Sequence, residues 1–133
     1  MPSRPAAATM IRNALHPLHL TQISEPCIAD LADFMVKTTE AEITLGMKKG
    51  PVNSHLEDDA KITAGHVEAI VMGERGWTAA DIKEGVENET PDPVWSILAK
   101  HDPDHFSLEH LERTQAVNSL RLDVYERESR GKR

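Results

Sequence analysis

The chain of 133 residues contains one cysteine, Cys27, and aromatic side chains make up only 4% of it. A single thiol can form neither an internal disulfide nor a thiolate metal cluster. Aromatic residues are enriched in β-strands and form the surfaces on which single-stranded nucleic acid stacks, so their scarcity argues against both kinds of domain. Cys27 stands near apolar residues such as Ile28 and Leu31, which favours a small core residue over a nucleophile.

The sequence also lacks long apolar runs and an excess of basic residues. No stretch approaches the ~18 apolar residues of a membrane span, and no signal peptide is recognisable. We therefore expect a cytoplasmic protein that does not enter the membrane. The formal net charge of −7 disfavours nucleic acid as a partner, because duplex binding gains most of its affinity from Lys and Arg. The local exception is a basic tail over residues 129–133, with Arg130, Lys132 and Arg133.

What the sequence does contain is helical periodicity, with apolar residues recurring every three or four positions. No segment shows the apolar–polar alternation of a half-buried strand. Residues of the helix-capping type precede the periodic segments. These caps are Ser24 or Glu25, Ser54 in the capping box Ser54-His55-Leu56-Glu57, Thr78, Asp92 and Ser107. The pattern predicts an all-α fold, a single-domain bundle of about five helices.

The predicted bundle occupies residues 23–128 and is preceded by an arm over residues 1–22. Three prolines and weak periodicity in this first segment favour an extended or flexible conformation over a core helix. The domain organisation that follows is an arm, a helical domain and the basic tail.

The last predicted helix carries apolar residues on two sides. Leu122 and Tyr125 lie on one side, whereas Val117, Leu120 and Val124 lie on nearly the opposite side. A helix at the edge of a core needs only one apolar side, so the second is buried by another element or by a partner. We expect these five residues to bind another protein or a second copy of the chain.

This interface makes a non-enzymatic interaction module the leading functional hypothesis. The chain would act as an adaptor, a regulator or a small subunit of a larger assembly, without a cofactor. The sequence shows neither a nucleophile elbow nor a phosphate-binding P-loop, so an enzymatic activity has little support.

A first alternative is a DNA-binding transcriptional regulator that uses residues 66–88. Two helical patterns joined by the loop sequence GERGWT allow a helix-turn-helix. Arg75 in the loop, with Thr78 and Lys83 in the second helix, would then contact nucleic acid together with the basic tail. Two acidic residues in the same helix suit a major groove poorly. An ordinary helical corner is therefore the favoured interpretation of this segment.

The same loop, with Gly73 and Gly76 on either side of Glu74 and Arg75, resembles the GxxG element of KH domains. This resemblance implies contact between the loop and a nucleic-acid backbone. The pattern departs from the family in its acidic residue and in the absence of recognisable flanking strands.

A second alternative concerns the stretch HDPDHFSLEHLER, which begins at His101. The His101-Asp102 pair resembles the signature of HD-type metal phosphohydrolases, which are also all-α. The resemblance implies metal-dependent hydrolysis, with His101, Asp102 and His105 as candidate ligands. Histidines four residues apart share a face of a helix, but Pro103 stands between these two. We favour a polar loop that leads into the helix capped by Ser107.

Overall fold

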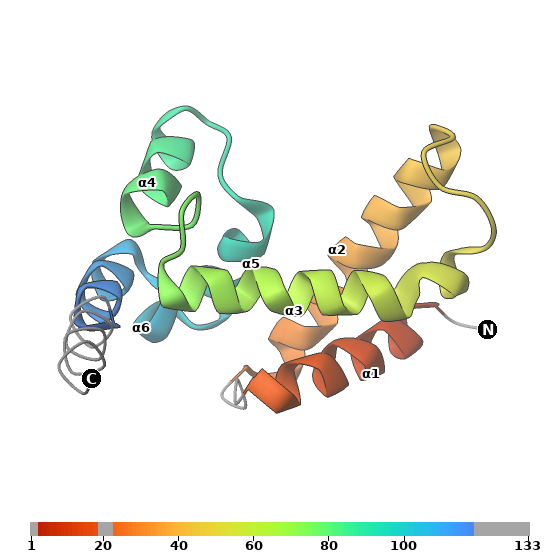
Figure 1. Ribbon diagram of the computed structural model, residues 1–133, viewed down its shortest axis with the longest axis horizontal. Helices are drawn as coiled ribbons and strands as arrows, with labels where there is room; N and C mark the ends of the chain where they lie inside the picture. The colour runs from red at the N-terminus through yellow and green to blue at the C-terminus, as the bar shows by residue number, and fades with distance from the viewer. Residues whose placement is uncertain (1–2, 19–22, 119–133) are drawn as a thin grey trace, which may run out of the picture. The chain divides into compact units, whose positions relative to one another are not determined.

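The computed structural model describes residues 3–18 and 23–118, and Figure 1 shows their helical arrangement. These residues contain no strand, which confirms the all-α prediction. The chain divides into two compact units, Met1–Glu68 and Ala69–Arg133, where the sequence predicted a single bundle behind an arm. The first unit contains α1 (Ser3–Leu15), η1 (His16–Leu18), α2 (Glu25–Thr44), η2 (Val52–His55) and most of α3 (Leu56–Met72).

Helix α1 replaces the predicted N-terminal arm, so the prediction was wrong for residues 3–15. Ala7, Ile11 and Leu15 are buried at four-residue spacing, and the helix packs against α2. Pro5 lies in the first turn, where backbone N–H groups have no intrahelical partner in any case. Pro17 follows the end of the helix and breaks nothing. Both prolines therefore occupy positions that a helix tolerates.

Helix α2 begins as the sequence predicted. The Ser24 hydroxyl accepts a hydrogen bond from the N–H of Cys27 at 3.4 Å, and Pro26 lies in the first turn. Both Met35 and Val36 are buried, although they lie on different sides of the helix. Helix α2 is therefore buried on two sides at this point.

Helix α3 buries Leu56, Ala60, Ala64, Val67 and Ile70, which recur every three or four residues, and leaves Val71 half-buried. The predicted capping box does not form, because the four residues of η2 already turn before α3 begins. Within η2 the Ser54 hydroxyl donates to the carbonyl of Pro51 at 2.7 Å and so does not cap α3.

The second unit contains α4 (Ala79–Glu87), α5 (Pro93–His101), α6 (Pro103–Phe106) and helical residues 108–118. Its predicted caps are confirmed. Thr78 accepts from the N–H of Asp81 at 3.2 Å, Asp92 from Trp95 at 2.9 Å, and Ser107 from His110 at 3.2 Å. The core of this unit is formed by Ala69, Ile70, Ala79, Ile82, Val94, Leu98, Phe106 and Leu111.

Candidate functional site

A concave surface lies in the first unit, between α1 and α3. Each helix contributes residues at three- and four-residue spacing, so each presents one face to the same space. Figure 1 shows the two helices running beside each other at this point. The lining residues are Met10, Asn13, Ala14, Pro17 and Leu18 from α1 and η1, and Glu57, Lys61, Ala64, Gly65 and Glu68 from α3. We call this surface the α1–α3 groove.

The groove encloses about 500 Å³, which falls in the range of protein ligand sites. Small residues from both helices, Ala14, Ala64 and Gly65, form part of its lining. A methyl group added at Gly65 would meet no atom within 4 Å, so the groove is open above this residue. The small side chains leave room for a bound group to approach the backbone of α3.

The polar residues of the groove are not equivalent. Lys61 Nζ lies 3.7 Å from Glu57 Oε1 in an exposed ion pair one helical turn apart. Glu68 is half-buried, and its carboxylate has no hydrogen-bond or ion-pair partner among the described residues. Glu68 is therefore the acidic group in the groove that a bound partner could neutralise.

Two ion-pair clusters join the α1 wall of the groove to α2. Arg12 binds both carboxylate oxygens of Glu25, at 3.0 and 2.5 Å. Arg4 lies 2.6 Å from Asp33, which also pairs with Lys37 at 2.9 Å. The hydrogen bond from Arg12 lowers the pKa of Glu25, and that from Lys37, assisted by the charge of Arg4, lowers the pKa of Asp33. These contacts fix the side of α1 away from the groove.

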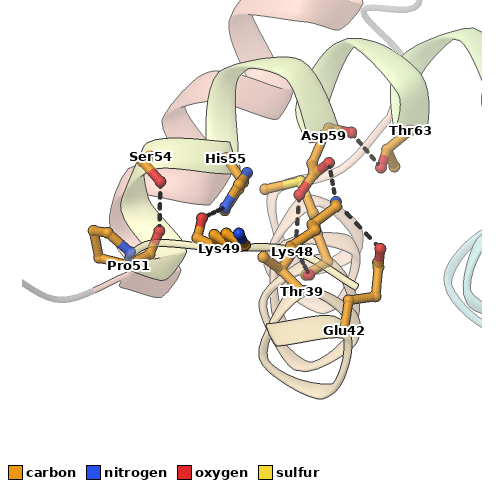
Figure 2. Close-up of polar contacts among 10 residues, drawn as sticks. Thr39, Glu42, Lys48, Lys49, Pro51, Ser54, His55, Asp59 and Thr63 are labelled. Carbon is orange, nitrogen blue, oxygen red and sulfur yellow. Dashed lines mark hydrogen bonds and ion pairs between the residues drawn. The ribbon is translucent and has the colours of Figure 1, made fainter. Parts of the chain in front are cut away.

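A second network fixes the α3 wall, and Figure 2 shows its residues. Asp59 on α3 accepts hydrogen bonds from the Thr39 hydroxyl at 2.7 Å and from Lys48 Nζ at 2.9 Å. Lys48 also lies 3.4 Å from Glu42, and the bond to Asp59 raises the lysine's pKa. His55 Nε2 lies 2.6 Å from the carbonyl oxygen of Lys49. These contacts close the connection between α2 and α3, so their role is structural.

The predicted metal residues lie where α5 ends and α6 begins. Asp102 accepts a hydrogen bond from the N–H of His105 at 3.3 Å, and His105 Nδ1 lies 2.8 Å from Asp102 Oδ2. His101 is the last residue of α5, and Pro103 separates it from His105, as the sequence indicated. No group of three or more His, Cys, Asp or Glu side chains in residues 3–18 and 23–118 could hold a metal ion. Metal binding at His101, Asp102 and His105 therefore stays a prediction from the sequence.

The residues of the helix-turn-helix alternative surround the loop between α3 and α4. Thr78 caps α4, and its hydroxyl donates to Asp81 Oδ2 at 2.5 Å. This bond and the N–H of Gly76 lower the pKa of Asp81, so an acidic group is fixed at the start of the helix that would enter DNA. Arg75 and Lys83 are exposed. Arg130, Lys132 and Arg133 lie outside the described residues.

The loop itself is held from within the second unit by Gln115. Its amide nitrogen donates to the carbonyls of Ile70 at 2.8 Å and Trp77 at 3.3 Å, while its oxygen accepts from the N–H of Ala79 at 2.8 Å. Gly73 lies directly against this side chain. The described residues contain no strand, so the loop lacks the sheet that accompanies a GxxG element in KH domains. The loop is therefore a buttressed helical corner.

Val117 is the one residue of the predicted interface that the structure describes. Its side chain is 48% exposed, whereas Leu111 on the same helix is buried. Leu120, Leu122, Val124 and Tyr125 lie outside the described residues.

Sequence reasoning missed the α1–α3 groove. Its α1 wall belongs to the segment predicted as an arm, and its α3 wall lies beside the buried residues of that helix. The sequence did contain one signal. Met10, Ala14 and Pro17 are separated by the same intervals as Lys61, Gly65 and Glu68, so each set lies on one helical face. Spacing alone could not show that these two stripes face each other.

Comparison with known proteins leaves the fold and the site as the basis for a functional conclusion. The chain matches no protein-family model, no curated protein and no solved structure. Among the described helices, none combines the length and the hydropathy that a bilayer span requires.

Proposed function

We propose that this chain is a helical protein-binding module, an adaptor, regulator or subunit that acts without catalysis. The observation that carries the proposal is the α1–α3 groove, a preformed concavity whose walls are fixed by contacts on their far sides. Its lining offers apolar surface for recognition, the ion pair of Lys61 with Glu57, and the carboxylate of Glu68, which has no partner among the described residues. The exposed side chain of Val117 supports a second contact surface on the last helix.

The groove can be blocked at Gly65 without disturbing the core. A leucine at this position would project into open space and occupy the groove, whereas an alanine would add only one methyl group. Both substitutions remove a helical glycine, so both favour α3 by about 0.5–1 kcal/mol. Comparing Gly65→Leu with Gly65→Ala therefore separates the effect of filling the groove from the effect of a more stable helix.

The test compares three immobilised full-length proteins in an extract of the source cells: the natural chain, Gly65→Ala and Gly65→Leu. We expect the natural chain and Gly65→Ala to retain the same proteins, and Gly65→Leu to lose them while its helical circular dichroism is unchanged. Equal retention by all three proteins would reject the groove as the binding surface. The charge substitution Val117→Asp tests the second surface in the same assay.

A further inference from the structure

Resting on the proposed function, we infer that the occupant of the α1–α3 groove is an amphipathic helix of a partner protein. This helix places apolar side chains along the groove and a Lys or Arg against Glu68. The inference rests on the backbone of the walls, the size of the lining residues and the charge at one end of the groove.

The walls determine the secondary structure of the ligand. Both are helices, so their backbone N–H and C=O groups are already bonded within each helix. A peptide in an extended conformation would gain no backbone hydrogen bonds from them and would bury its own groups unpaired. A helical peptide satisfies its backbone internally, which makes helix-in-groove binding the mode that these walls accept.

The dimensions determine the length of the ligand. The α3 wall extends from Glu57 to Glu68, which corresponds to about 16 Å of helix, or three turns, at ~1.5 Å per residue. Apolar anchors at positions i, i+3 or i+4, i+7 and i+11 of a ligand helix span ~16 Å and cover that distance. Ala14, Ala64 and Gly65 allow the close approach that two packed helices need.

The charge determines one polar residue of the ligand. A helix that covers the groove would remove water from Glu68, and a buried carboxylate without a partner is costly. Glu57 already pairs with Lys61, so its charge is compensated within α3. Glu68 has no such compensation among the described residues, and the ligand must therefore supply a cation at that end. A small apolar molecule would leave the same carboxylate uncompensated.

The probe is a displayed library of random sixteen-residue peptides, selected on the full-length protein at low salt. We expect the selected peptides to share apolar residues at helical spacing and at least one Lys or Arg at one end. Glu68→Gln should weaken their binding three- to tenfold and reduce its salt dependence. Glu40→Gln makes the same change at an exposed position of α2 outside the groove, and it should leave binding within twofold.

The other outcomes of the selection distinguish a failure of this inference from a failure of the proposed function. One such outcome is that the peptides fail to bind Gly65→Leu and yet share no Lys or Arg; another is that they bind Glu68→Gln and Glu40→Gln equally well. Either result would overturn this inference but leave the groove as a binding site. Binding that survives Gly65→Leu, or a selection that yields no peptides, would reject both proposals. A natural chain that dimerises in sedimentation, with Gly65→Leu monomeric, would identify a second copy as the occupant and overturn this inference.

Discussion

Two glycines show how the surroundings of a residue decide what a substitution does. Gly65 is helical and faces open space, so a side chain there meets nothing. Gly73 has a φ of 70°, and a Cβ added to it would lie 2.7 Å from the side chain of Gln115. The first glycine costs helix stability, whereas the second is required by the turn that ends α3.

The two glycines therefore predict opposite results for the same substitution. Gly65→Ala should raise the free energy of unfolding by about 0.5–1 kcal/mol, because alanine restricts the unfolded chain and favours the helix. Gly73→Ala should lower it by at least about 1–2 kcal/mol, because a left-handed backbone and a close contact both oppose a Cβ. Thermal unfolding followed by circular dichroism measures both. A fall for Gly65→Ala would show that the groove is filled at this position.

Gln115 is the second residue whose role depends on its neighbours. It interrupts the apolar stripe of its helix because its amide binds three backbone groups around the α3–α4 loop. A carboxylate would keep the acceptor for the N–H of Ala79 but would face the carbonyls of Ile70 and Trp77.

We therefore expect Gln115→Glu to destabilise the protein at neutral pH by about 1–3 kcal/mol, since two part-buried carbonyls lose the hydrogen bonds from the amide and face a carboxylate. The reverse change at a solvent-exposed position of the same helix, Glu112→Gln, is the control and should be neutral. Urea unfolding measures both variants. Equal stability of the two would mean that the Gln115 hydrogen bonds do not hold the loop.

At the scale of elements, the connection between α2 and α3 depends on Asp59. This carboxylate is 12% exposed and binds both Thr39 and Lys48, so its loss removes one of the two partners of a buried hydroxyl and of a partly buried ammonium (Figure 2). Asp58, the preceding residue, is exposed.

Asp59→Asn should lower the free energy of unfolding by about 1.5–3 kcal/mol, the range of hydrogen bonds to charged groups. Asp58→Asn removes the same charge from the neighbouring position of α3 and should change stability by less than ~0.5 kcal/mol. Chemical denaturation of both variants gives the comparison. If the two substitutions have the same effect, the loss arises from helix electrostatics and not from the network.

The attachment of α1 to α2 should depend on pH in the acid range. Glu25 and Asp33 have pKa values below their ordinary 4.5 and 3.8 in the folded protein, because of Arg12 for the first and Lys37 for the second. A carboxyl whose pKa is lowered by folding stabilises the fold above its unfolded value and loses that contribution as the pH falls through the folded value.

The double variant Glu25→Gln, Asp33→Asn should therefore melt at a lower temperature than the natural chain at neutral pH, and the difference should shrink between about pH 5 and pH 2. Glu40→Gln with Asp58→Asn removes two exposed charges from the same unit and serves as the control. Thermal melts across this range measure the effect. A constant difference at every pH would show that the two carboxylates do not couple α1 to α2.

At the scale of the whole molecule, the net charge of −7 and the acidic start of α4 argue against duplex binding. We expect a random-sequence DNA duplex to be retained neither at about 0.05 M nor at 0.2 M salt in a gel-shift assay. The variant with Arg130, Lys132 and Arg133 replaced by alanine is the comparison. If the natural chain retains the duplex at low salt and this variant does not, the basic tail binds nucleic acid. That result would support the DNA-binding alternative.

Local signals made much of the helical architecture predictable. Ser24, Thr78, Asp92 and Ser107 cap their helices as expected, because an N-cap hydrogen bond spans only two or three residues. The same reasoning failed at Ser54, where a 3-10 turn already encloses the residue. It also failed for α1. Prolines inside a helix break it, but the described prolines of this segment lie at the ends of the helix, where proline is tolerated.

The sequence by itself determined an all-α protein and the start of most helices, because each depends on residues within a few positions of one another. Tertiary structure alone decided that α1 lies against α2, that Gln115 holds a loop far from it in sequence, and that two stripes face each other to form the α1–α3 groove. Periodicity shows which residues share a face, but which face another element covers depends on packing between distant segments.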